Sequence, residues 1–288
     1  MKEKIYLFYH NSNHRGPGAV VNNLLKGLKG IGAEVVGEVS QADFAGCLQH
    51  PGANYDHFPT NTLMGPNLFV IPDESKDLCN KYQNFIVPSE WVKNLYFSFD
   101  IMKEKKIDVW SVGIDTENWQ QDKSLSQDNQ IDCFIYYKNR TQQDLALIYK
   151  LCLYFKLKFE LIEYGSYKEE QLRNLCNRSK FAILLTGTES QGIAYMNILS
   201  MNIPCYVFEN SMWIYDKNKE IKMPATSVPY FDNKCGVITK NLDIKDFQSF
   251  ILNVEKNLYT TREYIIQNHT LEQSANKYVD LLKGINNV

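Results

Sequence analysis

Two short stretches of the sequence carry charged residues where a phosphate-bearing ligand could bind. The segment IYYKNR contains Lys138 and Arg140 directly after an apolar run, and the segment LLTGTESQG contains Glu189, followed by Gly192. An ammonium and a guanidinium together suit a diphosphate. A carboxylate ahead of a helix can accept a ligand hydroxyl while the free helix amides bind an anion. A solvated cation pair and a helix N-cap at Glu189 are the structural alternatives.

A third stretch, HNSNHRGPGAVVNNLL, places Gly16 and Gly18 between an expected strand and an expected helix. Glycine lets a ligand approach the backbone, and the helix amides could then bind phosphate. The stretch is neither G-x-G-x-x-G, because Val21 occupies the third glycine position, nor a P-loop. A tight turn that contains Pro17 is the alternative to a glycine-rich binding loop.

Histidine and aromatic residues add weaker candidates. His50 follows an expected strand and could hydrogen-bond a substrate, although a loop histidine with structural partners is equally plausible. His10 and His14 flank the glycine stretch, and we rank His14 higher as a residue lining the site. The turn-rich segment PATSVPYFDNKCG, which contains Tyr230, could be a lid, an acceptor-binding loop or a packed connection.

These candidates depend on an alternation of short apolar runs and helical stretches, which predicts an α/β fold with parallel sheets. The expected strands include KIYLFYH, FAGCLQH, NLFVIP and NFIVPS, and later DCFIYYK, KFELIEYG, KFAILLTG and PCYVFE. A polar stretch at 119–130 is the predicted linker. We therefore expect two Rossmann-like domains, at 1–118 and 131–288, the second with a helical end. Ligands of such domains lie at the carboxyl ends of the strands.

The composition restricts the class of protein. The chain of 288 residues is 44% hydrophobic with a net charge of -2, so it lacks the basic excess typical of nucleic-acid binding. Its seven cysteines are scattered, without C-x-x-C or a nearby histidine at metal spacing, which indicates reduced thiols. No D-x-D or H-E-x-x-H motif occurs, so we expect no metal site, and no G-x-S-x-G motif of a serine nucleophile occurs either. Without a signal peptide or a long apolar run, a cytoplasmic location is expected.

Several segments together resemble the retaining glycosyltransferases of family 4, in a compact form. They are RGPGAVVNNLLKGLKGIG, VPSEWVKNLY, VWSVGIDTENW, IYYKNR and TESQGIAYMNILSMNIPCYV. The resemblance implies the GT-B fold, in which two Rossmann-like domains face each other across a cleft that holds a nucleotide-sugar donor. It implies that Lys138 and Arg140 neutralise the donor diphosphate, although they are more closely spaced than in the family. It also places His50 at the reacting sugar.

The family motif consists of a Glu that contacts the donor sugar, seven residues, and a second Glu that contacts the ribose. Glu189 matches the first position, but Asn197 occupies the second. An amide can bind a ribose hydroxyl only as a neutral partner with a shorter reach, so altered nucleotide recognition is expected. The complete expected donor-binding set is Gly16, Gly18, Lys138, Arg140, Tyr164, Gly165, Glu189, Ser190, Gln191, Gly192, Ile193 and Asn197.

The implied reaction moves a sugar from a UDP- or GDP-sugar to an acceptor hydroxyl, with retention and without a metal ion or other cofactor. Lys138, Arg140 and the amides of residues 190–193 would stabilise the departing diphosphate.

A non-catalytic nucleotide- or sugar-binding homologue, acting as a partner subunit, is the alternative from another class, and Asn197 supports it. A nicotinamide oxidoreductase would require a stricter glycine pattern. The expected partners are the nucleotide sugar and a carbohydrate acceptor, with no nucleic acid. Peripheral membrane contact is allowed, as are a monomer and a homodimer.

Overall fold

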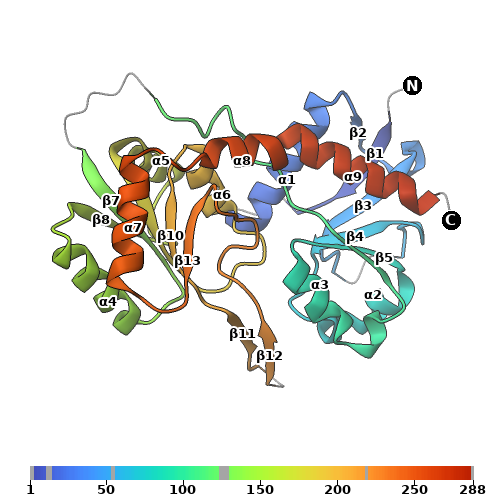
Figure 1. Cartoon of the computed structure of the whole chain (residues 1–288). Helices are drawn as coiled ribbons and strands as arrows, with labels where there is room; N and C mark the ends of the chain where they lie inside the picture. Colours follow the sequence, from blue (N-terminus) through green and yellow to red (C-terminus); the bar gives the residue numbers. More distant parts are fainter. Residues whose placement is uncertain (1–2, 11–14, 53–55, 123–129, 218–219, 287–288) are drawn as a thin grey trace. The chain divides into compact units, whose positions relative to one another are not determined.

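The computed structural model describes residues 3–10, 15–52, 56–122, 130–217 and 220–286 (Figure 1). The chain divides into two compact units. Unit 1 comprises Met1–Gly113 and His269–Val288, and unit 2 comprises Ile114–Asn268. Each unit contains a parallel sheet with helices between its strands, so the predicted α/β class is confirmed.

Unit 1 contains a six-stranded parallel sheet in the order β2-β1-β3-β4-β5-β6. Its strands are β1 (Lys4–Phe8), β2 (Glu34–Val36), β3 (Phe44–Gln49), β4 (Leu63–Asn67), β5 (Asn84–Val87) and β6 (Lys106–Val109). Its helices are α1 (Arg15–Gly30), α2 (Lys76–Lys81), α3 (Glu90–Phe97) and α9 (Leu271–Asn286), with short 3-10 turns η1 (Val39–Gln41), η2 (Pro72–Ser75) and η3 (Asp100–Met102).

Helix α9 belongs to unit 1 although it follows unit 2 in the chain, and it packs against α1 and β3. The indole N–H of Trp110 donates to the Ser274 carbonyl oxygen at 2.9 Å, and Ser274 Oγ donates to the Ser111 carbonyl oxygen at 2.7 Å. Gly113 permits this close approach, because a Cβ there would collide with the Thr270–Leu271 backbone. The sequence places residues 131–288 in one domain. The structure differs, because the buried face of α9 covers unit 1.

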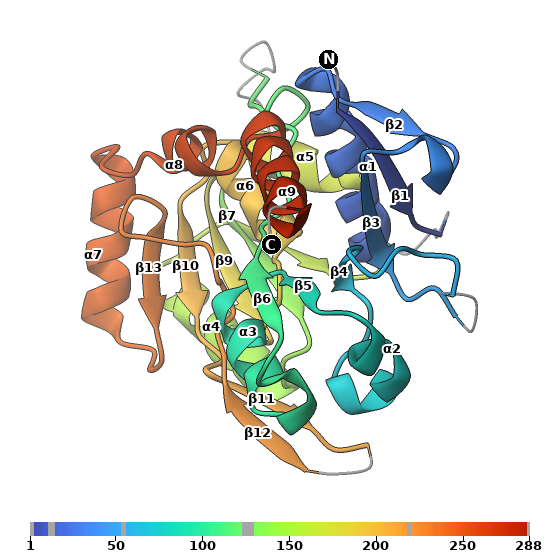
Figure 2. The same ribbon diagram turned by 90° about the vertical axis from the view of Figure 1, so that its right-hand side faces the viewer.

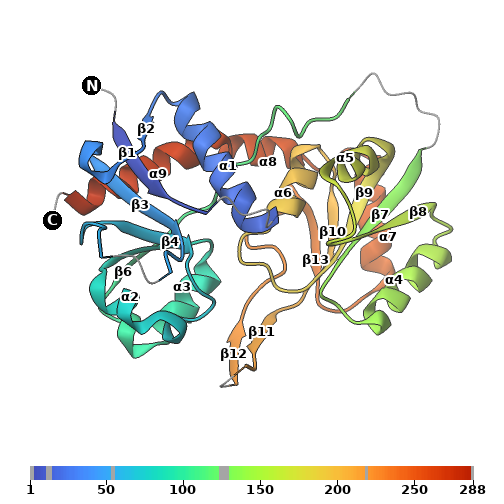
Figure 3. The same ribbon diagram turned by 180° about the vertical axis from the view of Figure 1, so that it is seen from behind.

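Unit 2 contains a five-stranded parallel sheet in the order β13-β10-β9-β7-β8. Its strands are β7 (Ile131–Lys138), β8 (Phe159–Glu163), β9 (Ser179–Thr186), β10 (Cys205–Phe208) and β13 (Gly236–Thr239). Its helices are α4 (Gln142–Tyr154), α5 (Glu169–Arg178), α6 (Ile193–Ser200), α7 (Ile244–Glu255) and α8 (Thr261–Asn268). Helices α4 and α7 contribute to one hydrophobic core of the sheet, and α5, α6 and α8 to the other (Figure 3). An antiparallel hairpin of β11 (Met212–Tyr215) and β12 (Ile221–Pro224) projects from unit 2 (Figures 1 and 2).

The predicted linker at 119–130 begins inside unit 2. Trp119 is buried in its core. Arg262 Nη1 donates to the carbonyl oxygens of Trp119 at 2.9 Å and Ser200 at 2.7 Å, and Nη2 donates to that of Thr116 at 3.0 Å. One guanidinium therefore holds the entry to unit 2 against α6 and α8, while residues 123–129 lie outside the described part of the chain.

All seven cysteines are buried and free. Burial raises the pKa of the Cys47 and Cys235 thiols to about 12. These thiols are therefore uncharged at neutral pH and serve as apolar core residues. In the described ranges, no helix is both long and apolar enough to cross a bilayer.

The buried hydroxyl of Tyr278 on α9 has no hydrogen-bond partner among the described residues. We expect Tyr278→Phe to leave the free energy of unfolding unchanged or to raise it by about 1 kcal/mol, because a desolvated, unpaired hydroxyl is removed. Urea unfolding measures this change. The control Ser274→Ala removes a formed hydrogen bond and should lower the free energy of unfolding by about 1 kcal/mol. A clear loss of stability in Tyr278→Phe would contradict the expectation.

Candidate functional site

The carboxyl ends of β7 and β9 form the topological switch point of unit 2. From β7 the chain passes to β8 on one side and returns to β9 on the other. Such a reversal opens a crevice at the carboxyl ends of the two strands, where α/β sheets bind ligands. Lys138 is the last residue of β7, and Glu189 lies three residues after Thr186 ends β9. The topology therefore brings both predicted charged residues to this point.

Lys138 and Glu189 form an ion pair in which the ammonium contacts both carboxylate oxygens. Lys138 Nζ lies 2.8 Å from Glu189 Oε1 and 2.9 Å from Oε2. The side chains are only 19% and 13% exposed. Burial raises the pKa of Glu189, and the neighbouring Lys138 ammonium acts against that rise. A cation and an anion are thus held together at the sheet edge, where water screens them weakly.

Tyr164 provides an aromatic surface beside this pair. Lys138 Nζ lies 4.3 Å from the centroid of the Tyr164 ring, within the range of a cation–π interaction. Tyr164 is 41% exposed, and its backbone N–H donates to the Tyr137 carbonyl oxygen at 2.9 Å. Gly165 follows with φ of +92°. The predicted residue Tyr164 therefore lies next to Lys138, and Gly165 follows it in the chain.

The segment from Ser190 to Ile193 leads into α6, with Gly192 as its N-cap residue. Gly192 has φ of +79°, and a Cβ there would collide with the Tyr195 ring, so glycine is required for both reasons. The Glu189 N–H donates to the Thr226 carbonyl oxygen at 2.9 Å, and Tyr195 Oη accepts from the Tyr230 N–H at 2.9 Å. The segment that contains Tyr230 is therefore fastened to α6 and to the Glu189 loop.

Two polar atoms near this edge are buried without a hydrogen bond to any described residue. They are Asn197 Oδ1 on α6 and Thr186 Oγ1 at the end of β9. The Asn197 side chain, at the position where the family motif has its second Glu, belongs to a residue that is 7% exposed. A buried acceptor without a donor costs about 1–3 kcal/mol. Unpaired polar groups of this kind are uncommon in native structures and call for an explanation such as a ligand or an ordered water.

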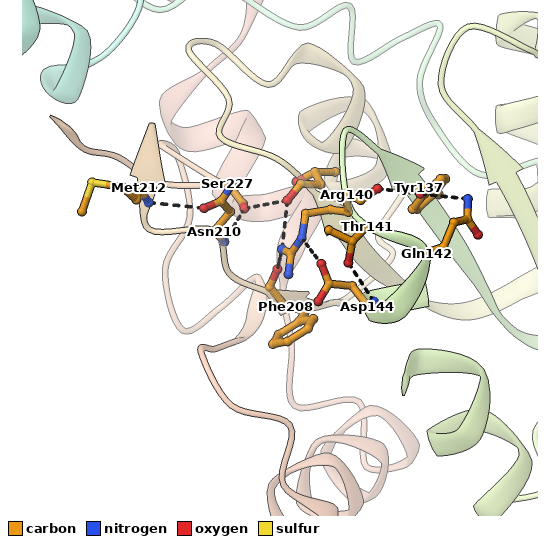
Figure 4. A network of polar contacts seen from close by, with 10 residues as sticks. Tyr137, Arg140, Thr141, Gln142, Asp144, Phe208, Asn210, Met212 and Ser227 are labelled. Atoms are coloured by element: carbon orange, nitrogen blue, oxygen red, sulfur yellow. Dashed lines mark hydrogen bonds and ion pairs between the residues drawn. The ribbon is translucent and has the colours of Figure 1, made fainter. Parts of the chain in front are cut away.

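The Arg140 guanidinium is hydrogen-bonded to protein groups at the carboxyl end of the sheet. Its Nε donates to Asp144 Oδ2 at 3.0 Å, and its Nη1 donates to the carbonyl oxygens of Phe208 at 2.7 Å and Thr186 at 3.2 Å (Figure 4). Ser227 Oγ donates to the same Thr186 carbonyl oxygen at 3.1 Å. Arg140 therefore joins the ends of β9 and β10 to the first turn of α4. Its predicted contact with a diphosphate stays a prediction, and the contacts observed are those of a brace.

The switch point of unit 1 lies between β1 and β3, on either side of which the chain adds β2 and β4. His50 directly follows β3, and its two ring nitrogens contact protein groups. The Gly52 N–H lies 3.0 Å from Nδ1, and Ser75 Oγ lies 2.9 Å from Nε2. His10 lies beyond the end of β1, with Nε2 3.0 Å from the His50 carbonyl oxygen. His14 lies outside the described residues.

The expected glycine-rich loop is wrong, because Gly16 and Gly18 lie in the first turns of α1. Pro17 explains the difference. Its fixed φ is compatible with a helix, and its missing N–H is not needed in the first turn, where no intrahelical acceptor exists. The glycines are therefore part of the helix and not of a loop, and a ligand contact at Gly16 or Gly18 stays a prediction.

Sequence reasoning missed the brace around Arg140 and the position of His10. The i, i+4 spacing of Arg140 and Asp144 is a local signal for an ion pair on a helix. The sequence could not indicate that Arg140 contacts the carbonyl oxygens of Thr186 and Phe208, because every residue has a backbone carbonyl. In the described part of the chain, no three His, Cys, Asp or Glu side chains gather as metal ligands would.

No model of a known protein family matches the sequence, and no curated protein sequence matches it. Solved structures do match. AviGT4, a glycosyltransferase involved in avilamycin A biosynthesis, has a TM-score of 0.64 at 11% identity, over 100% of this chain and 99% of that chain. Sucrose-phosphate synthase from Thermosynechococcus elongatus has a TM-score of 0.61 at 9% identity, over 100% of both chains. An alpha-glucosyltransferase in complex with UDP and a 13-mer DNA has a TM-score of 0.54 at 10% identity, over 98% of this chain and 100% of that chain. These matches show that the chain has the GT-B fold of glycosyltransferases.

Removal of Lys138 should expose the cost of the buried Glu189 carboxylate. In Lys138→Ala the pKa of Glu189 rises further, so the folded state binds a proton more readily than the unfolded state does. The carboxylate then lowers stability at neutral pH, and this loss disappears as the pH falls towards the unfolded pKa of about 4.3. We expect a decrease in the free energy of unfolding of about 2 kcal/mol at pH 7 and a smaller decrease at pH 4.5.

Urea unfolding at the two pH values measures this difference. The double variant Lys138→Ala, Glu189→Gln provides the control, because it lacks the titrating carboxyl and should recover part of the stability at pH 7. An equal deficit for Lys138→Ala at both pH values would show that the carboxylate is not the source of the loss.

Proposed function

We propose that the chain is a glycosyltransferase of the family 4 type, which moves a sugar from a nucleoside-diphosphate sugar to an acceptor hydroxyl. The observation that supports this most directly is the Lys138–Glu189 pair at the switch point of unit 2, in a chain with the GT-B fold. A pair of opposite charges that is mostly covered from water is poorly explained as a stabilising element, because desolvation offsets most of the attraction. It is well explained as a site that holds a ligand with both anionic and hydroxyl groups.

In this proposal Lys138 and the amides in the first turn of α6 bind the donor diphosphate. The ammonium moves from Glu189 towards the phosphate oxygens, and the released carboxylate accepts hydroxyl groups of the donor sugar. Tyr164 packs beside the bound nucleotide. Arg140 acts as a positioning residue, because it fixes the strand ends from which the Glu189 loop departs.

Asn197 receives the ribose in this proposal. Its buried Oδ1 has no donor among the described residues, and a ribose hydroxyl supplies one. The neutral amide replaces the charge-assisted contact of the family motif and weakens the nucleotide contact by about 1 kcal/mol. The alpha-glucosyltransferase solved with UDP shares the fold, which favours a UDP-sugar as the first donor to test.

The chemistry follows from where charge develops. As the bond between the anomeric carbon and the phosphate oxygen breaks, its electron pair goes to the diphosphate, which Lys138 stabilises. The acceptor oxygen forms the new bond to the same carbon from the face that the diphosphate leaves, and its proton passes to the departing phosphate oxygen. This route gives retention and requires no enzymic nucleophile and no metal ion.

The same observations allow a second function, a nucleotide-sugar-binding protein without turnover, because Asn197 is neutral where the family motif has a carboxylate. The two functions predict the same binding but differ in hydrolysis. A transferase without its acceptor slowly transfers the sugar to water and releases the nucleoside diphosphate, whereas a binding protein does not.

Calorimetry with UDP, GDP and ADP, followed by their common sugars, tests the site. We expect one nucleotide to bind, and Lys138→Ala to weaken it about 10- to 100-fold, the effect of losing one charge-assisted hydrogen bond. Glu189→Ala should spare the nucleotide and lower donor turnover by at least about 100-fold, as loss of a group that positions the reacting sugar does.

Lys180→Ala is the matched control. Lys180 pairs with Asp132 at 2.7 Å, but it lies near the beginning of β9, at the opposite edge of the sheet. This variant should bind the nucleotide as the unaltered chain does. Equal affinity in Lys138→Ala and Lys180→Ala would contradict the proposed site.

A further inference from the structure

We propose that His10, and not His50, is the histidine of unit 1 that accepts a hydrogen bond from a hydroxyl of the sugar acceptor. This inference rests on the proposed function, because it names a binding contact for the second substrate. It assigns a residue that neither the family motif nor the sequence ranking selected.

The hydrogen bonds around His50 determine the tautomer of its imidazole. The Gly52 backbone N–H can only donate, so His50 Nδ1 at 3.0 Å must accept. In the neutral ring the proton is therefore on Nε2, which donates to Ser75 Oγ at 2.9 Å. Both nitrogens of His50 are occupied by the protein, so a substrate would have to displace one of these bonds.

The same reasoning shows that one ring nitrogen of His10 is available to accept a hydrogen bond. Its Nε2 lies 3.0 Å from the His50 carbonyl oxygen, and a carbonyl oxygen can only accept. Nε2 therefore carries the proton, and in the neutral ring Nδ1 keeps its lone pair. Among the described residues, Nδ1 has no hydrogen-bond partner.

His10 is held in place while it is exposed to solvent. Its N–H donates to Gln49 Oε1 at 2.7 Å, which ties the end of β1 to the end of β3. Its ring packs edge-on against Phe8, with 5.1 Å between the ring centroids and 83° between the planes. With Nε2 bound to the neighbouring backbone, the orientation of Nδ1 is fixed before any ligand arrives, which reduces the entropy lost on binding.

The chemistry of this group selects the ligand. The lone pair of a neutral imidazole accepts a hydrogen bond from a hydroxyl but not from an ionised phosphate or carboxylate oxygen, which has no proton to donate. His10 also lies at the switch point of the unit 1 sheet, the place where an α/β sheet binds a ligand. The geometry therefore points to a neutral, hydroxylated ligand at unit 1, which is the chemistry of a sugar acceptor.

Two substitutions separate the ring nitrogens. In His10→Gln the side-chain amide nitrogen replaces Nε2 and can still donate to the His50 carbonyl, but the acceptor at Nδ1 is lost. In His10→Asn the amide oxygen replaces Nδ1 and can still accept from a hydroxyl. His57→Gln is the matched control, because His57 is an exposed histidine whose ring packs on Phe58 and not on Phe8.

The experiment uses the full chain with the donor found by calorimetry and with p-nitrophenyl glucoside, galactoside and mannoside as acceptor probes. We expect His10→Gln to raise the acceptor KM about 10-fold, the loss expected for one unpaired hydrogen-bonding group, with unchanged donor affinity. His10→Asn should raise it less, and His57→Gln should not change it. Nitrogen-15 NMR of labelled histidine should show His10 Nδ1 unprotonated and shifted by the acceptor probe.

An acceptor KM in His10→Gln equal to that of the unaltered chain, or a larger effect in His50→Gln, would overturn this inference alone. A proton on His10 Nδ1 in the NMR spectrum would overturn it as well. Failure of the proposed function is seen separately, as the absence of nucleotide release by the unaltered chain from every donor tested, and it would remove the basis of both proposals.

Discussion

The constraint on which this structure depends is a reversal in the order of strands in each parallel sheet. The chain leaves β1 to form β2 and returns on the other side with β3, and it repeats this with β7, β8 and β9. Each reversal separates the carboxyl ends of two central strands. His10 and His50 lie at one opening, and Lys138 and Glu189 lie at the other. The positions of these candidate residues thus follow from topology more than from any local motif.

The Lys138–Glu189 pair contributes little to the stability of the fold. Both side chains are largely covered, so their desolvation offsets the attraction between them. The nearby Arg140 is covered as well, but its Nε and Nη1 donate to Asp144 and to two carbonyl oxygens, which makes it a structural connection. Lys138 and Arg140 therefore differ in how readily a ligand could contact them, because their partners differ. A ligand can separate Lys138 from Glu189 without breaking the contacts that join the strand ends, so this pair is the one suited to binding.

The sequence predicted the fold class and the strands that carry the charged residues, because apolar periodicity and parallel order are enough to place Lys138 and Glu189 at one edge. It could not predict which cation is braced, since the partners of Arg140 are backbone carbonyls distant in the chain. The tautomer of His50 depends on Gly52, and that of His10 depends on the His50 carbonyl oxygen, and no spacing rule connects either histidine to its partner. The placement of α9 on unit 1 was also beyond reach, because an amphipathic helix does not specify which sheet it covers.

The return of α9 to unit 1 has a consequence for how the chain matures on the ribosome. All the elements of unit 2 have been synthesised by Asn268, whereas unit 1 still lacks Ser274, the partner of Trp110, at that point. Amino-terminal domains usually fold first, but here the core of unit 2 can be completed before the core of unit 1. Until α9 is synthesised, the apolar side chains of unit 1 that it covers stay exposed, and exposed apolar surface of this kind favours aggregation and chaperone binding.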